Sequence, residues 1–189
     1  MLEIGIGGSK DDPCSGGASL RMWRQYFRKS MIYGVDIVNK RCLEEKRIKV
    51  FQGDQNDPEF LQRIAAQIGK IDIIIDDGSH ISAHIITSFI TLFPYLDDAG
   101  IYAIEDLATA YWPLYGGNWQ NLDAPGTSMS MLKGLADGLN YKVIPHRVIQ
   151  AFDQQIVALH FYPKIAFVIK GHNDYPLSAI DHKMLGGEQ

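Results

Sequence analysis

Residues 71–80 read Ile-Asp-Ile-Ile-Ile-Asp-Asp-Gly-Ser-His, and this stretch decides the fold predicted for the whole chain. A short apolar run bounded by turn residues predicts a buried strand of a parallel sheet. The run ends abruptly in Asp76, Asp77 and, three residues after Asp77, His80. In an open α/β sheet, ligands bind outside the carboxyl ends of the strands. We therefore expect the chemistry at this strand end, where the side chains suit cofactor contact, metal ligation and proton removal.

A second stretch repeats this design. Residues 100–106 read Gly-Ile-Tyr-Ala-Ile-Glu-Asp, an apolar run that ends in Glu105 and Asp106. Because neighbouring parallel strands end at the same edge of a sheet, Asp77 is expected to lie close to these two acids. Oxygen ligands without cysteine indicate a hard cation, and Mg²⁺ is the ion that we predict. The alternative is that one or two of the acids cap the helices that follow.

Composition and charge narrow the class of protein. The 189 residues suit one domain with a core, and 46% hydrophobic residues are ordinary for a globular protein. A net charge of -4 argues against a nucleic-acid partner. The apolar runs fall short of the roughly 20 residues of a membrane helix, so no membrane partner is expected. Cys14 and Cys42 lack metal-type spacing and are predicted to be reduced thiols of a cytoplasmic protein.

Apolar runs alternate with amphipathic stretches along the chain, which predicts βαβ units and a parallel sheet. The predicted fold class is α/β and Rossmann-like: a mostly parallel seven-stranded sheet with a C-terminal antiparallel hairpin. Residues 107–125 are rich in aromatic residues without a clear period and are expected to form a long loop that acts as a lid. Strands are expected at 1–6, 31–37, 48–51, 71–75, from 100, 155–162 and 165–170, and helices at 18–29, from Asp57-Pro58 to Gly69, 82–96 and 127–139.

The first predicted strand ends in a glycine-rich segment, Glu3-Ile-Gly-Ile-Gly-Gly8. Glycines at such a place let a ligand approach the backbone closely. A dinucleotide site prefers a third glycine where this chain has Lys10. Asp11 and Asp12 follow, and their charges repel phosphate but suit a cationic ligand. S-adenosylmethionine carries a sulfonium and an ammonium group and no phosphate, so it is the favoured cofactor; the alternative is a purely structural glycine cluster.

Two further acids lie at predicted strand ends. Asp36 ends the second strand, where an acid accepts hydrogen bonds from the ribose hydroxyls of nucleoside cofactors. Asp54 follows the third strand and is placed to meet an adenine amino group. The alternatives are a solvated turn aspartate for Asp36 and a loop acid beside a helix for Asp54.

The histidines and the aromatic residues complete the candidate site. His80 lies at the strand mouth and is predicted to be the general base, whereas His84, four residues later, is read as an ordinary histidine. Tyr111, Trp112 and Tyr115 either stack against a sugar or ring of the substrate or fill the core.

Several of these motifs together resemble a known family. The chain is similar to the class I S-adenosylmethionine-dependent methyltransferases, and within them to the metal-dependent sugar O-methyltransferases of macrolide and related antibiotic biosynthesis. The similarity spans residues 1–171. The motifs that carry it are Leu-Glu-Ile-Gly-Ile-Gly-Gly at 2–8, Tyr-Gly-Val-Asp-Ile at 33–37, Phe-Gln-Gly-Asp-Gln at 51–55, Ile-Asp-Asp-Gly-Ser-His at 75–80, Ala-Ile-Glu-Asp-Leu at 103–107 and Leu-His-Phe-Tyr at 159–162.

The resemblance implies roles for individual residues. Asp77, Glu105 and Asp106 would hold Mg²⁺, and His80 would be the base. The acceptor would be a small molecule, the hydroxyl of a sugar or of a glycosylated natural product. Glu3, Gly5, Gly7, Asp36, Gln52, Asp54 and Asp76 are the predicted cofactor contacts, and Tyr111, Trp112 and Tyr115 are the predicted substrate contacts.

The resemblance also implies an organisation for the chain. Residues 1–171 are expected to form a methyltransferase domain that lacks an N-terminal helix, and residues 172–189 a loose tail. A homo-oligomer is expected. Two rival functions remain open: an NAD-dependent Rossmann-type oxidoreductase, and a non-catalytic, truncated methyltransferase-like protein.

Overall fold

The structure, a computed structural model, describes residues 1–9 and 11–185. Lys10, which stands where a dinucleotide motif has its third glycine, lies outside the described residues, as do residues 186–189 of the predicted tail.

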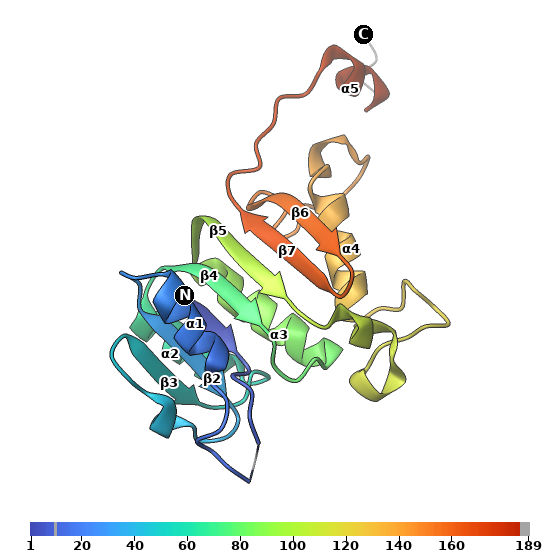
Figure 1. Cartoon of the computed structure of the whole chain (residues 1–189). Coiled ribbons are helices and arrows are strands. Elements are labelled where there is room, and N and C mark those ends of the chain that lie inside the picture. Colours follow the sequence, from blue (N-terminus) through green and yellow to red (C-terminus); the bar gives the residue numbers. More distant parts are fainter. Residues whose placement is uncertain (10, 186–189) are drawn as a thin grey trace.

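The molecule is built on one seven-stranded sheet with the order β3-β2-β1-β4-β5-β7-β6, which confirms the predicted fold (Figure 1). Neighbouring strands from β3 to β5 pair in parallel, and β7 pairs antiparallel with both β5 and β6. The strand order reverses between β1 and β4, so the strand ends diverge there and leave room for a ligand. The strands are β1 (Leu2–Ile4), β2 (Ile32–Asp36), β3 (Ile48–Gln52), β4 (Ile71–Asp76), β5 (Leu96–Ile104), β6 (Ile156–Tyr162) and β7 (Ile165–Lys170).

Helices cover both faces of this sheet. Helix α1 (Ala18–Tyr26) packs Leu20 into a core cluster with Ile6 and Ile32. On the other face, α2 (Pro58–Ile68), α3 (Ser82–Leu92) and α4 (Ser128–Gly138) contribute buried side chains to a second, larger cluster, among them Leu61, Phe89 and Leu132. The short 3-10 helices are η1 (Arg41–Leu43), η2 (Phe93–Tyr95), η3 (Leu107–Tyr111), η4 (Pro113–Tyr115) and η5 (Tyr141–Val143).

Some element boundaries differ from the prediction. The helix expected at 82–96 ends at Leu92, because Pro94 lacks an N–H and cannot continue the helical hydrogen bonds; the chain tightens into η2, which contains Pro94. Strand β5 then begins at Leu96 rather than near residue 100. The loop expected at 107–125 contains η3 and η4, so its first half is partly ordered into helical turns.

The region after β7 is only in part the loose tail that was expected. Asn173 donates from Nδ2 to the carbonyl oxygens of Leu139 and Asp153, and Tyr141 Oη donates to the Asn173 carbonyl. These bonds tie the start of the tail to the end of α4 and to the loop before β6. Beyond them, α5 (Ala179–Met184) lies apart from the sheet, at the top of Figure 1.

The cysteine prediction was wrong, because Cys14 and Cys42 form a disulfide across 28 residues. The bond joins the loop after β1 to η1, which follows β2. Sequence spacing did not reveal the pair because only the parallel pairing of β1 with β2 brings these loops together. Within residues 1–9 and 11–185, no helix is both long and apolar enough to cross a membrane.

The start of α2 yields a prediction about stability. Asp57 accepts a hydrogen bond from the Phe60 N–H at 3.0 Å, and Pro58 occupies the first turn, as the sequence predicted. Asp57→Ala removes this cap and is expected to lower the free energy of unfolding by about 1 kcal/mol, as measured by urea denaturation. Gln62→Ala, on the exposed face of the same helix, is the control and should change it by less than about 0.5 kcal/mol. Equal losses in the two variants would contradict the capping role.

Candidate active site

The ends of β1, β4 and β5 are held together beyond the last residue of each strand. Asp77 N–H donates to the Ile4 carbonyl at 2.9 Å, and Glu105 N–H donates to the Asp76 carbonyl at 2.9 Å. These bonds continue the sheet past the ends of β4 and β5. The acids at the two strand ends are therefore fixed relative to each other by backbone hydrogen bonds.

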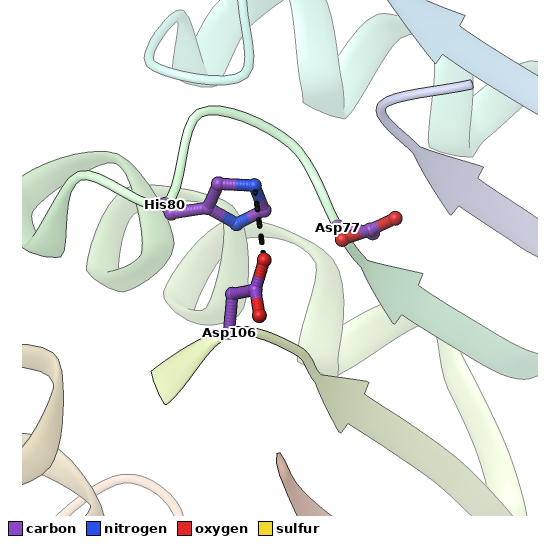
Figure 2. Close-up of side chains that lie close together, drawn as sticks. All are labelled: Asp77, His80 and Asp106. Carbon is purple, nitrogen blue, oxygen red and sulfur yellow. Dashed lines mark ion pairs between the residues drawn. The ribbon is translucent and has the colours of Figure 1, made fainter. Parts of the chain in front are cut away.

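Three of the predicted site residues meet at this edge. Asp77, His80 and Asp106 each offer a ligand atom within 4.8 Å of the other two. Figure 2 shows Asp77 at the end of β4, His80 on the turn that follows it and Asp106 just after β5. His80 Nε2 lies 3.8 Å from Asp106 Oδ2. The predicted convergence of the two strand ends is present in the structure.

Glu105 is next to this cluster but outside the group whose ligand atoms approach within 4.8 Å. Burial, reinforced by the charges of Asp77 and Asp106, raises the pKa of Glu105. Burial likewise raises the pKa of Asp77; the nearby His80 opposes this effect, and Asp106 adds to it. Partly buried like charges that raise one another's pKa are stabilised by a bound cation.

The cluster depends on two unusual backbone conformations. His80 has a φ of 58° and Asp106 a φ of 50°, both in the left-handed region that side chains other than glycine rarely adopt. Such conformations persist when the surrounding contacts enforce them, and they gather at functional sites. Here they turn both side chains toward the same point beyond the sheet edge.

A cleft of about 330 Å³ opens beside the cluster, where the strand order reverses. Gly5, Asp36 and Asp54 line it, as predicted for cofactor contacts. Gly5 has a φ of 80°, and a Cβ there would lie 2.1 Å from the Asp77 carbonyl oxygen, so only glycine fits. The other lining residues are Ile4, Val35, Ile37, Gly53, Gln55, Gly78, Ser79 and His84.

Glu3, also predicted to contact the cofactor, is buried in β1 and is not among the residues that line the cleft. It is 3% exposed, and Ser19 Oγ donates to its Oε1, but its Oε2 has no hydrogen-bond partner among the described residues. Burial raises the pKa of Glu3 to about 7; Asp77 and Glu105 add to the rise, and the Ser19 bond opposes it. A buried carboxylate oxygen without a donor is a group that a cationic ligand would satisfy.

Asp76 does not line the cleft, although it was predicted to contact the cofactor. It is 1% exposed, and its two oxygens accept bonds from Gln55 Nε2 and Ser88 Oγ. Burial raises its pKa to about 6, against the lowering effect of these two bonds. The structure therefore places the Asp76 carboxylate beneath the site rather than in it.

Two other predicted contacts, Gly7 and Gln52, are exposed and are also not among the residues that line the cleft. Gly7 belongs to the glycine-rich loop, which is hydrogen-bonded to the buried side chain of Lys40. Lys40 is 2% exposed, and its Nζ donates to the carbonyls of Gly7 at 2.5 Å and Ser15 at 3.1 Å. Because lysine side chains are rarely buried, the sequence did not indicate that Lys40, in the polar segment after β2, would pack under this loop.

The structure also adds residues that the sequence analysis had missed. His84, read as ordinary, lines the cleft, and its Nδ1 lies 2.9 Å from Ser79 Oγ. Its place in the first turn of α3, directly after the strand-end turn, was the available signal. Gln55 also lines the cleft, and nothing in its sequence neighbourhood distinguishes it from a polar loop residue.

The aromatic residues lie in the segment that follows Asp106 directly. Tyr111 ends η3, and Tyr115 ends η4. Trp112 is 52% exposed, and its ring centroid lies 6.0 Å from that of Tyr115. The exposure of Trp112 argues against the core-filling alternative for this residue.

A larger groove of about 510 Å³ lies between α2 and α3. Of the described residues that line it, none is an acid, a histidine or a lysine. The smaller cleft at the strand ends combines acids, histidine and glycine, so we assign the site there.

Comparisons with known proteins show which proteins this chain resembles. No family model matches the chain. It is 50% identical, over 177 residues, to mycinamicin VI 2''-O-methyltransferase of Micromonospora griseorubida, an alignment that covers 92% of this chain and 44% of that protein. It is 49% identical to 8-demethyl-8-alpha-L-rhamnosyl tetracenomycin-C 2'-O-methyltransferase of Streptomyces olivaceus over 92% of this chain and 46% of that protein.

A comparison with solved structures finds a protein of the same kind. The MycE methyltransferase from the mycinamycin biosynthetic pathway, in complex with Mg, SAH and mycinamycin VI, superposes with a TM-score of 0.88 at 48% identity. The match covers 95% of this chain and 48% of that one. This chain thus spans about half the length of the relatives that it matches. The similarity to sugar O-methyltransferases inferred from the motifs is confirmed.

The buried state of Glu3 leads to a prediction about pH. Since the pKa is about 7 in the folded protein and near 4.5 in the unfolded chain, the folded state holds more protons between these values. Stability should therefore fall as the pH rises through this window. Relative to Glu3→Gln, the free energy of unfolding of the wild type is expected to fall by about 2 kcal/mol from pH 5 to pH 8. Urea denaturation at both pH values measures this, and parallel pH dependences would contradict it.

Proposed function

We propose that this chain is a metal-dependent O-methyltransferase domain that moves a methyl group from S-adenosylmethionine to a hydroxyl of a sugar or glycosylated natural product. The observation that carries the proposal is the cluster of Asp77, His80 and Asp106 at the mouth of a cleft lined by acids and glycine. The names of the relatives support the acceptor class, since they methylate sugar-bearing compounds.

The cleft fits the proposed donor in size and charge. A volume of about 330 Å³ lies within the range of small-molecule sites. Asp36 and Asp54 line the cleft and offer acceptors for the hydroxyl and amino groups of a nucleoside. Glu3 is buried outside that lining, and its Oε2, without a donor among the described residues, would be stabilised by a positive charge nearby. A phosphate-bearing dinucleotide would meet these same acids as repulsive charges, which disfavours the oxidoreductase alternative.

The strand-end acids fit the proposed metal. Asp77, Glu105 and Asp106 supply carboxylate oxygens, the ligands that Mg²⁺ prefers. Burial raises the pKa of Asp77 and of Glu105, and the charge of Asp106 adds to the rise in both, so a bound cation would relieve the repulsion between these acids. When bound, Mg²⁺ supplies Lewis-acid stabilisation of the negative charge that develops on an acceptor oxygen.

His80 is the proposed general base. The reaction breaks the bond between the donor sulfur and its methyl carbon, forms a bond from that carbon to the acceptor oxygen, and releases the hydroxyl proton. Nε2 of His80 would take that proton, and Asp106 Oδ2, 3.8 Å away, would stabilise the imidazolium that results. The unusual φ of His80 directs its ring toward the cluster, so the base is oriented before the substrate binds.

The aromatic segment is the proposed wall of the acceptor pocket. Tyr111, Trp112 and Tyr115 follow Asp106 within nine residues, and aromatic faces pack well against sugar rings.

An oligomer of this chain stays a prediction, as does the domain boundary at residue 171. Because Cys14 and Cys42 are bonded, the cysteines no longer argue for a reducing compartment, and the cytoplasmic location also stays a prediction.

A binding experiment tests the proposed function directly. Isothermal titration with S-adenosylhomocysteine is expected to show one site, and titration with NAD(H) is expected to show no binding. Methyl transfer to a glycoside acceptor should stop on addition of EDTA and return with excess Mg²⁺, because the strand-end acids need the ion to balance their charge. Binding of NAD(H) without a response to S-adenosylhomocysteine would overturn the proposal. A chain that binds neither ligand would favour the non-catalytic alternative.

The role of His80 can be separated from metal ligation. His80→Ala is expected to lower kcat by about 10²–10⁴-fold because the base is lost, while Mg²⁺ affinity changes by less than about twofold. Measured kcat and a Mg²⁺ titration decide between the roles, and His172→Ala, an exposed histidine after β7, is the control. If His80 were a metal ligand instead, the affinity for Mg²⁺ would fall together with kcat.

A further inference from the structure

Gln55 occupies an unusual position in the loop after β3. Its side chain is 6% exposed, whereas its neighbours Asp54 and Asn56 are exposed. A buried amide must satisfy both its oxygen and its nitrogen. The bonds that do so connect Gln55 to the turn that carries the proposed base.

The two ends of the Gln55 amide bind two different parts of the strand-end turn. Oε1 accepts a hydrogen bond from Ser79 N–H at 2.6 Å, and Nε2 donates to Asp76 Oδ1 at 3.1 Å. The backbone N–H of Ser79 can only donate, so the amide oxygen must face it and the amide NH₂ group faces Asp76. Asp76 is in turn held by Ser88 on α3. Gln55 thus links the β3 loop, the β4 end and α3.

The turn itself leaves little room for other arrangements. A Cβ on Gly78 would lie 2.0 Å from Gln55 Oε1, and a Cβ on Gly5 would lie 2.1 Å from the Asp77 carbonyl oxygen. The turn is therefore wedged between β1 and the Gln55 amide. His80, directly after Ser79, has the left-handed φ of 58°. Such a backbone needs contacts that enforce it, and the Gln55–Ser79 bond supplies one from another loop, one residue before His80.

Gln55 also faces the cleft, which it lines together with Gly78 and Ser79. One side of the side chain is therefore exposed to a ligand in the cleft, and the other holds the turn with Asp77 and His80. A ligand that fixes Gln55 would fix the turn as well. By linkage, any metal bound at the turn would then affect the ligand in the cleft by the same factor.

We propose that Gln55 is a positioning residue that holds the turn of residues 77–80 in its active conformation and couples binding in the cleft to metal binding at Asp77, which lies on that turn. The coupling rests on the proposed function, since it names the donor and Mg²⁺ as the two ligands. The positioning of the turn stands on the Gln55 contacts alone.

The first test needs neither ligand. Amide hydrogen exchange followed by NMR should show Ser79 protected in the wild type, and at least about tenfold faster exchange at Ser79 in Gln55→Met, which keeps the side-chain length but removes both hydrogen-bonding ends. Gln55→Glu retains an oxygen for Ser79 N–H but loses the donor to Asp76, so its protection of Ser79 should lie between those of the wild type and Gln55→Met. The control is Asn56→Ala, which breaks the bond from Thr87 Oγ1 to the same loop but does not touch the turn. Unchanged exchange at Ser79 in Gln55→Met would overturn the proposal.

The second test measures the coupling. Mg²⁺ is titrated with and without S-adenosylhomocysteine, and the wild type and Asn56→Ala are expected to bind Mg²⁺ about 5-fold or more tightly in its presence. In Gln55→Met this ratio should fall to within about twofold of unity, and kcat should fall further than KM rises, because the base is no longer held in place. A ratio equal to that of the wild type would refute the coupling. If the wild type bound neither ligand, the proposed function would fail, while the exchange experiment would still decide the role of Gln55.

Discussion

The structure depends on negative charge concentrated at the ends of adjacent strands. Glu3 lies in β1, and Asp77 and Glu105 directly follow β4 and β5. Burial raises the pKa of each; Asp77 and Glu105 add to the rise at Glu3, and Asp106 adds to the rise at Asp77 and Glu105. Backbone hydrogen bonds between the strand ends prevent these groups from moving apart. Such an arrangement costs stability in the free protein and becomes favourable when cations bind. A sulfonium donor and a divalent metal are cations of the required kinds.

A rigid backbone holds this charge in place. The left-handed conformations of His80 and Asp106 direct both side chains toward the same point. His80 lies on the turn after β4, and Asp106 lies two residues after the end of β5. Two buried side chains hold the neighbouring loops by hydrogen bonds: Gln55 holds the strand-end turn, and Lys40 holds the glycine-rich loop. Buried polar side chains of this kind contribute a defined geometry through fully satisfied hydrogen bonds. The loops that border the cleft and the cluster are thus both held by buried side-chain hydrogen bonds.

Much of the fold and part of the site followed from sequence patterns. Apolar runs ending in acids located β4 and β5, and Asp57-Pro58 located the start of α2. The meeting of Asp77 with His80 and Asp106 followed from the rule that parallel strands end at one edge. Gln55, Lys40 and the bond between Cys14 and Cys42 could not be predicted, because their partners lie 21 to 33 residues away and are reached only after the strands pair.

The sequence by itself determined the order of the elements, the strand ends that carry acids and the residue types available for chemistry, because hydrophobic period and turn residues act over a few neighbouring positions. Only the tertiary structure decided that Asp76 lies beneath the site and Asp77 in it. The side chains of adjacent strand residues point to opposite sides, so one carboxylate met Gln55 and Ser88 while the next met His80 and Asp106. Which of two neighbouring acids joins the cluster was thus decided by the packing of α3 and the β3 loop on one face of the sheet.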